Sequence, residues 1–152
     1  MRIVLYEPEI PWNTGNIGRT CVAAGAALHL IKPLGFRIGG KEIRRAGLDY
    51  WSKLRLHVHD SFPDFLSSLP EGASVLAFST KAKPSFRDAP YREDSYLIFG
   101  GESCGLPEAA LRRYSQSLFR IPQTSAVRSL NLSTAAALVL YEGLRRVGQD
   151  PQ

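Results

Sequence analysis

The chain has 152 residues, of which 44% are hydrophobic and 22% charged, and this composition excludes disordered, collagen-like and membrane-embedded proteins. A chain of this length builds one hydrophobic core, so we expect a single domain spanning residues 1–152. Lysine and arginine total 19 against 14 aspartate and glutamate, and the net charge of +5 favours a polyanionic partner. Solvated basic helix faces would explain the same excess.

Targeting signals and metal-binding motifs are missing from the sequence. The start, MRIVLYEPE, has neither the basic region nor the cleavage site of a secretory signal, and no apolar run is long enough to span a membrane. Cys21 and Cys104 lack Cys-x-x-Cys spacing, so we expect free thiols. His57 and His59 share one face of a predicted strand but have no third ligand, which favours surface histidines over a metal site. We therefore predict a cytoplasmic protein without metal or membrane contact.

Hydrophobic periodicity divides the chain into alternating strands and helices. In chain order we expect a strand at 3–6, a turn entering a helix at 13–26, a strand at 27–33, a glycine- and charge-rich segment at 34–53, a strand at 54–59, a short helix at 62–69, a strand at 74–80, a loop at 84–94, a strand at 96–100, a helix at 108–114, a strand at 117–122 and a long helix at 131–147. This alternation predicts an α/β fold whose mostly parallel sheet is covered by helices on both faces. Ligands bind such sheets at the carboxyl ends of the strands, so we expect the function in the loops that follow them.

The first candidate loop, residues 13–19 (NTGNIGR), follows a strand and opens a helix. Gly15 and Gly18 permit close backbone approach, and free amides at a helix start favour an anion. A dinucleotide site is an alternative, but the spacing differs from Gly-x-Gly-x-x-Gly, and the second strand ends in Lys32 and Pro33 instead of an acid. A capped helix start with a surface arginine explains the motif about as well.

Two more loops combine glycine and polar residues after strands. Residues 99–107 (FGGESCGLP) contain Glu102 as their only acid, and its carboxylate suits either a ligand or backbone amides. Residues 121–133 enter the last helix, where Ser129 or Asn131 is suited to cap the first turn. These loops have the composition of a ligand site, but each one alone also has a structural explanation.

Taken together, these segments resemble the three motifs of the SPOUT RNA methyltransferases. The resemblance is carried by LYEPEIPWNTGNIGR, RRAGLDYW, FGGESCGLP and IPQTSAVRSLNLSTAAALVLYE, in this order and over nearly the whole chain. Three motifs in one order are highly specific, and they are similar to those of the subgroup that 2′-O-methylates the wobble nucleotide of tRNA. The resemblance therefore implies a tRNA methyltransferase acting at nucleotide 34.

The same resemblance implies a fold, a cofactor and an assembly. In the family the carboxyl-terminal part of the chain threads through a loop and forms a trefoil knot, an arrangement that is rare elsewhere. The pocket beside the knot holds a bent S-adenosylmethionine. A homodimer is expected to form through the first and last helices, without an added RNA-binding domain.

The roles of individual residues also follow from the resemblance. Arg19 is expected to polarise the ribose 2′-hydroxyl and stabilise the developing oxyanion, and because guanidinium stays protonated, the proton acceptor is left open. The other catalytic positions, expected to place Arg19 and shape the pocket, are Asn13, Glu102, Ser129 and Asn131. The positions expected to hold the cofactor are Phe78, Gly100, Ile121, Ser129 and Leu130.

Four further residues are expected to bind RNA. Arg44, Arg45 and Tyr50 lie in a segment whose charge suits phosphate, and Tyr141 on the last helix is placed to approach the target nucleotide. Tyr141 suits a dimer interface equally well.

Other functions compete with tRNA wobble methylation. Related knotted enzymes act on rRNA or on other tRNA positions, and the sequence does not separate these substrates. A non-catalytic RNA-binding module explains the basic residues but not three glycine-rich or polar loops after strands. A nicotinamide-dependent oxidoreductase requires a dinucleotide fingerprint that the first loop lacks.

Overall fold

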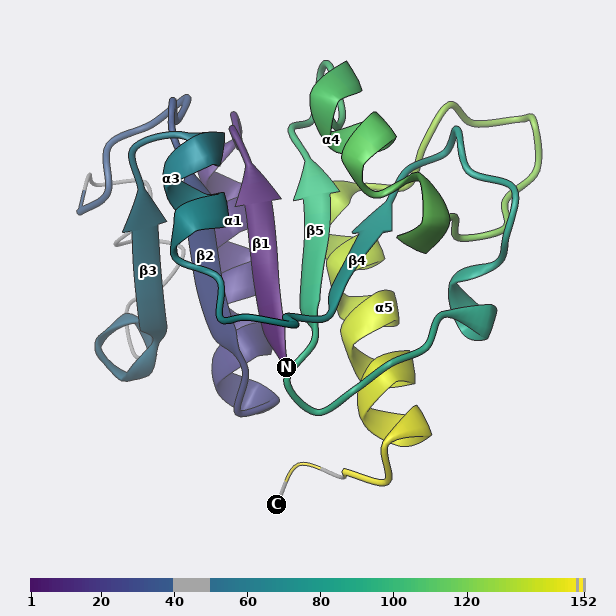
Figure 1. Cartoon of the computed structure of the whole chain (residues 1–152). Helices are drawn as coiled ribbons and strands as arrows, with labels where there is room; N and C mark the ends of the chain where they lie inside the picture. Colours follow the sequence, from purple (N-terminus) through teal and green to yellow (C-terminus); the bar gives the residue numbers. More distant parts are fainter. Residues whose placement is uncertain (40–49, 150, 152) are drawn as a thin grey trace.

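The computed structural model describes residues 1–39, 50–149 and 151, and a six-stranded sheet forms its centre (Figure 1). All strand pairs in this sheet are parallel, in the order β3-β2-β1-β5-β4-β6. The parallel sheet expected from the sequence is thus confirmed, and each strand overlaps its predicted range. The strands are β1 (Arg2–Tyr6), β2 (Ala27–Ile31), β3 (Arg55–His59), β4 (Val75–Phe78), β5 (Tyr96–Gly100) and β6 (Leu118–Phe119).

Helices cover both faces of the sheet, as predicted (Figure 1). The two long helices lie side by side on one face, and two short helices lie on the other. The long helices are α1 (Pro11–Ala23) and α5 (Leu132–Arg146), and the short ones are α3 (Phe62–Ser67) and α4 (Glu108–Arg113). Single 3-10 turns occur at η1 (Trp51–Lys53), η2 (Phe86–Asp88) and η3 (Ser115–Ser117).

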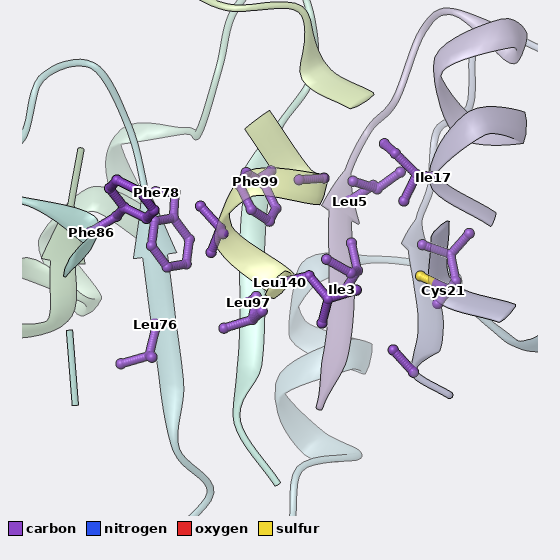
Figure 2. Packing of buried hydrophobic residues seen from close by; sticks show 14 of the residues in the cluster. Ile3, Leu5, Ile17, Cys21, Leu76, Phe78, Phe86, Leu97, Phe99 and Leu140 are labelled. Atoms are coloured by element: carbon purple, nitrogen blue, oxygen red, sulfur yellow. The ribbon is translucent and has the colours of Figure 1, made fainter. Parts of the chain in front are cut away.

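The alternating side chains of the strands supply a separate apolar core to each face. Ile3 and Leu5 of β1 are buried with Leu140 of α5 in one cluster, whereas Val4 is buried in the second cluster with Phe65 of α3. Figure 2 shows the first cluster packed between the sheet and the long helices. Leu140 is fully buried, so Leu140→Ala would leave a cavity and cost about 2–5 kcal/mol of stability.

Helix α1 begins earlier than the sequence predicted. It starts at Pro11, whose fixed φ suits the first helical position, so residues 13–19 lie within the helix and the predicted turn there is wrong. Gly18 is needed for packing: a Cβ at this position would lie 3.1 Å from the ring of Trp51 and 3.2 Å from Leu54. The glycine therefore brings η1 close to the helix and does not open an anion site at a helix start.

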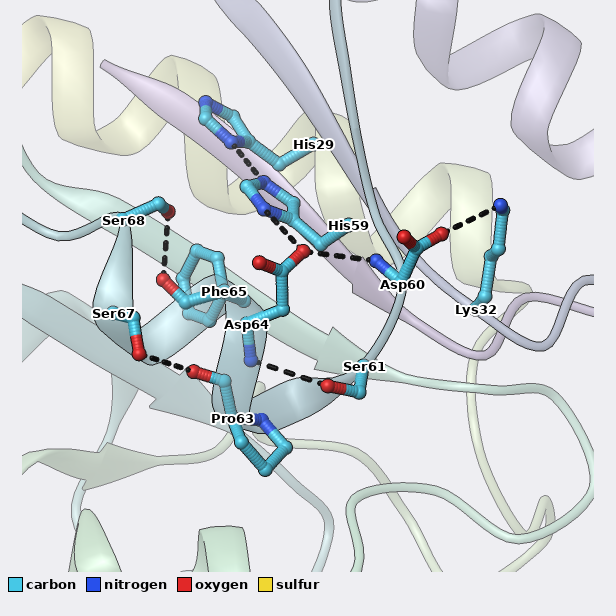
Figure 3. Close-up of polar contacts among 10 residues, drawn as sticks. All are labelled: His29, Lys32, His59, Asp60, Ser61, Pro63, Asp64, Phe65, Ser67 and Ser68. Carbon is cyan, nitrogen blue, oxygen red and sulfur yellow. Dashed lines mark hydrogen bonds and ion pairs between the residues drawn. The ribbon is translucent and has the colours of Figure 1, made fainter.

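The strand histidines differ from the expectation in one respect. His57 is exposed as predicted, but His59 is only 7% exposed, so the prediction of a surface histidine is wrong there. His59 lies beneath α3, with its ring 5.3 Å from that of Phe65, and its Nε2 is 3.0 Å from Nδ1 of buried His29 on β2 (Figure 3). Pairing with β2 and cover by α3 bury the imidazole.

Candidate active site

A cavity of about 440 Å³ lies at the carboxyl ends of the strands, where sheets of this type bind ligands. The loops after β1 and β5 meet there, because β1 and β5 are neighbours at the point where the strand order changes direction. The loop after β4 and the segment at 121–132 complete the walls. The volume falls within the range of about 300–1,000 Å³ typical of small-molecule sites.

The base of the cavity is apolar, and backbone forms one wall. Phe78 of β4 and Phe99 of β5 stack with their ring centroids 5.1 Å apart, and both line the cavity. Beside them, a Cβ at Gly100 would lie 1.9 Å from the carbonyl carbon of Gly105 and 2.1 Å from the nitrogen of Leu106. Only glycine lets the two segments approach so closely, which keeps main chain and not a side chain at this wall.

Glu102 joins the first two loops through its carboxylate. One oxygen accepts from the backbone nitrogen of Glu9 at 2.7 Å. The other accepts from the amide of Asn13 at 2.9 Å and the backbone nitrogen of Ile10 at 3.3 Å. Three donors and a charged acceptor make this a strong contact. The sequence left open whether Glu102 binds a ligand or backbone amides, and the structure shows it bonded to backbone amides.

Asn13 carries the same network on to the last helix. Its side-chain oxygen accepts from the amide of Asn131 at 3.0 Å, and Asn13 is only 6% exposed. Asn131 in turn caps α5, because its own oxygen accepts from the backbone nitrogens of Ser133 and Thr134. Of the two caps considered from the sequence, Asn131 is therefore the one used. Glu102, Asn13 and Asn131 thus link all three predicted loops.

The structure brings together most of the predicted site residues. All the predicted cofactor positions line the cavity, and so do four of the five predicted catalytic positions. The residues concerned are Phe78, Gly100, Ile121, Ser129 and Leu130, with Asn13, Glu102 and Asn131.

Arg19 is the exception. It lies six residues beyond Asn13 on α1, or about 9 Å along the helix axis, and it lines a separate groove between α1 and α5. Tyr141 of α5 lines the same groove. The guanidinium of Arg19 lies 5.1 Å from the ring centroid of Tyr50, which is a cation–π contact. The side chain therefore does not reach toward the cavity of its own chain.

The predicted RNA-binding residues are spread more widely. Arg44 and Arg45 lie outside the described residues. Tyr50 is only 8% exposed, and its hydroxyl donates to the carbonyl of Gly15 in α1, so the ring supports Arg19 from within the protein. Tyr141 is 45% exposed. Of these four residues, Tyr141 is the one that the structure shows on the surface.

Among the cavity residues that sequence reasoning did not assign to a ligand, three have charged or thiol side chains. Lys81 follows β4, Cys104 lies in the second loop, and Arg128 lies in the third. For Lys81 and Cys104 the available signal was a position shortly after a strand, whereas Arg128 lies well beyond the end of β6 at Phe119. Cys21 and Cys104 are free thiols, as expected.

Within residues 1–39, 50–149 and 151, no group of three or more His, Cys, Asp or Glu side chains is arranged to hold a metal ion. None of the helices in these ranges is long and apolar enough to cross a membrane.

The sequence of this chain is similar to that of a known protein family. A model of the SpoU rRNA Methylase family matches residues 1–141. The chain belongs to the SpoU rRNA Methylase family. The resemblance to RNA methyltransferases noted in the sequence is thereby confirmed.

Individual SpoU relatives match nearly the whole chain. A tRNA (cytidine(34)-2′-O)-methyltransferase from Yersinia pestis is 44% identical over 153 residues, covering 97% of this chain and 94% of the relative. A solved structure described as giving insights into the 2-OH methylation of C/U34 on tRNA has 50% identity and a TM-score of 0.92, covering 95% of this chain and 94% of its own.

A larger SpoU-like protein shares the fold. The AdoMet-bound rRNA methyltransferase from Sinorhizobium meliloti is 29% identical with a TM-score of 0.85, and the match covers 95% of this chain but 56% of that one. The SpoU domain described here is therefore common to proteins of different length.

Proposed function

We propose that this protein transfers a methyl group from S-adenosylmethionine to the ribose 2′-oxygen of nucleotide 34 of tRNA. The observation that carries the proposal is the 44% identity, over almost the full length of both chains, with a methyltransferase named for this reaction. The cavity at the strand ends supports it, because residues of all three motif loops line that cavity.

The residues around the cavity fit a ligand that has both a flat apolar part and polar ends. Phe78 and Ile121 offer apolar surface for an adenine ring. The backbone nitrogens of Ser129 and Leu130 form no hydrogen bond within the part of the chain that the structure describes, so they are free to bind a ligand. The bound cofactor supplies an electrophilic methyl group on a sulfonium.

The protein's own contribution to transfer is placement and charge. Glu102 is occupied by three donors, so its role is to hold the loops and not to take up the hydroxyl proton. Arg19 polarises the ribose hydroxyl and stabilises negative charge on the attacking oxygen. A guanidinium stays protonated near neutral pH, so Arg19 acts through its positive charge and does not accept the hydroxyl proton.

The position of Arg19 supports a homodimeric active site. Arg19 lines the α1–α5 groove and not the cavity of its own chain. Exposed apolar side chains lie on the same two helices: Trp12 is 50% exposed, Leu138 44% and Tyr141 45%. Pairing two copies over these helices would cover the apolar side chains and carry the partner's Arg19 toward the cavity. Sedimentation at micromolar concentration should give a dimer, and a monomer there would contradict this arrangement.

Three further expectations belong to this proposal. The trefoil knot is supported by the match to SpoU structures over nearly the whole chain. A single domain is supported by the one six-stranded sheet that the described residues form. A cytoplasmic location is supported by the proposed tRNA substrate, which is modified in that compartment.

The decisive test is to map ribose methylation in tRNA. Purified protein, S-adenosylmethionine and tRNA from a strain lacking the enzyme should yield a 2′-O-methyl group at nucleotide 34. Methylation of rRNA or of another tRNA position under the same conditions would favour the alternative substrates. Binding of S-adenosylhomocysteine without any methylation would favour a non-catalytic RNA-binding module, and binding of NAD in its place would favour an oxidoreductase.

A further inference from the structure

Glu9 and Ser103 join the first and second motif loops just outside the cavity. One carboxylate oxygen of Glu9 accepts from the backbone nitrogen of Ser103 at 2.9 Å, and the other accepts from the Ser103 hydroxyl at 2.6 Å. Gly101 leaves room for this contact, because a Cβ there would lie 3.2 Å from the Glu9 carboxylate and 2.6 Å from the carbonyl oxygen of Glu7. Glu9 and Ser103 therefore hold the two loops together through two hydrogen bonds, and this pair is called the clamp below.

The clamp extends to the third loop through the backbone of Ser103. The carbonyl oxygen of Ser103 accepts from the guanidinium of Arg128 at 2.7 Å. Arg128 lines the cavity and directly precedes Ser129 and Leu130, whose backbone is available for the cofactor. Glu9 and Ser103 do not line the cavity themselves.

Few other bonds hold the third loop. The side chain of Gln123 donates to the carbonyls of Val127 and Arg128, but these contacts lie within the loop. Asn131 contacts Asn13, but only where α5 begins. In the described part of the chain, the hydrogen bond from Arg128 to Ser103 is therefore the one that ties the middle of this loop to another motif.

The electrostatics of the clamp suit a stable contact at neutral pH. The two hydrogen bonds from Ser103 lower the pKa of the Glu9 carboxyl, which stays ionised. A carboxylate that accepts from a backbone nitrogen makes a stronger bond than a neutral acceptor. Glu9, Ser103 and Arg128 are all exposed, so their bonds order a surface loop and contribute little to the apolar core.

We propose that Glu9 and Ser103 are positioning residues, which hold Arg128 and with it the third loop in the conformation that binds the methyl donor. The identity of that ligand rests on the proposed function. The clamp acts through Arg128 and touches no reacting atom, so its loss should weaken cofactor binding and leave the chemical step intact.

The first test measures S-adenosylhomocysteine binding by calorimetry. Glu9→Ala removes both bonds and should weaken binding about tenfold, whereas Glu9→Gln keeps one acceptor and should weaken it less. Ser103→Ala should resemble Glu9→Gln, and Ser103→Thr, which keeps the hydroxyl, should restore most of the affinity. Glu71→Gln, an exposed acid in the turn before β4, is the matched control and should bind as wild type does.

Kinetics then separate positioning from a general structural defect. In Glu9→Ala the KM for S-adenosylmethionine should rise by a similar factor, while kcat at saturating cofactor and the melting temperature should stay near wild type. A fall in kcat at unchanged KM, or wild-type affinity in Glu9→Ala, would overturn the proposal.

A double-mutant cycle tests whether Glu9 acts through Arg128. If it does, Glu9→Ala should weaken binding much less in an Arg128→Gln background than in the wild type. Fully additive effects would overturn the proposed coupling. Wild-type protein that binds S-adenosylhomocysteine but leaves nucleotide 34 unmethylated would contradict the proposed function alone, whereas wild-type protein that does not bind it would overturn both.

Discussion

The loops around the cavity and the sheet surface beneath α3 each contain a polar network that includes a carboxylate, but the groups that meet the carboxylate differ. At the cavity, Glu102 is ionic and accepts from three donors, one of them the amide of Asn13. Beneath α3, buried His29 contacts His59, and His59 contacts Asp64 at 3.9 Å (Figure 3). The first network lines the cavity, whereas the second packs against the core.

Burial favours the neutral form of both histidines. Burial and neighbouring positive charge lower the pKa of His29 to about 3. Burial also lowers the pKa of His59, although Asp64 favours its charged form. Within the described residues, the buried Nε2 of His29 has no hydrogen-bond partner. The two imidazoles are therefore neutral at neutral pH and sensitive to acid. The Glu102 carboxylate instead joins loops through charged hydrogen bonds.

Buried polar side chains occur in both networks, so their burial alone does not identify the active site. The network at the strand ends is the one that joins separate loops around a cavity. Variants in the two regions should accordingly affect different properties, cofactor binding and methyl transfer in the first and acid stability in the second.

The largest effect is expected for Arg19, which lies on α1 in the groove beyond the Glu102 network. Arg19→Ala should lower the single-turnover rate of tRNA methylation by roughly 100-fold to 1,000-fold, as loss of one oxyanion-stabilising donor typically does. Affinity for S-adenosylhomocysteine should be unchanged, because Arg19 does not line the cavity. Arg19→Lys should recover little, because an ammonium lacks the planar fork of guanidinium. Wild-type methylation by Arg19→Ala would remove Arg19 from the mechanism.

A smaller loss is expected for the carboxylate that joins the loops. Glu102→Ala leaves three donors without their acceptor, and calorimetry should show cofactor affinity lower by about 10-fold to 100-fold, at a cost of about 1–3 kcal/mol for each unsatisfied donor that stays buried. Asp64→Asn is the matched control, because it removes the carboxylate of the histidine network. Equal losses in the two variants would erase the distinction between the networks.

The histidine network should control stability in acid. The folded pKa of His29 lies below the unfolded value of 6.5, so the unfolded state binds the proton more readily. The free energy of unfolding should therefore be steady above pH 6.5 and fall as the pH drops toward 3, by at most about 1.4 kcal/mol per pH unit for each proton taken up.

Urea unfolding at several pH values measures this dependence. His29→Gln should flatten it, whereas His57→Gln should leave most of it, because His57 is exposed. An unchanged slope in His29→Gln would show that other groups cause the acid sensitivity.

Local sequence pattern predicted the sheet because each strand is a compact apolar run, such as residues 96–100, and the helices repeat with helical period. It failed where distant contacts decide the structure. The pattern predicted a turn entering a helix where Gly18 stands, but Gly18 lies inside α1, which begins at Pro11, and Trp51 and Leu54 pack against it. The same limit applies to His59, whose burial depends on β2 and α3.

The candidate site was predictable loop by loop but not as an assembly. The motif positions identified Asn13, Glu102 and Asn131, yet the order of their hydrogen bonds depends on how the loops meet. The placement of Arg19 in a separate groove depends on where α1 begins and how it packs on α5, which no single segment encodes. Glu9 was missed because its partner, Ser103, is 94 residues away in sequence.

The central claim is that the cavity of one subunit works with Arg19 of the partner subunit, and mixing two impaired variants tests it most directly. Arg19→Ala retains an intact cavity, and Glu102→Ala retains Arg19. With S-adenosylmethionine near the wild-type KM, each homodimer should be weakly active, the first for lack of Arg19 and the second for lack of bound cofactor. After equal amounts are co-assembled, half of the dimers are mixed, and each has one intact site of two. The account predicts recovery to about a quarter of wild-type tRNA methylation. A mixture no more active than the average of the two variants would contradict it, because each active site would then lie within a single chain.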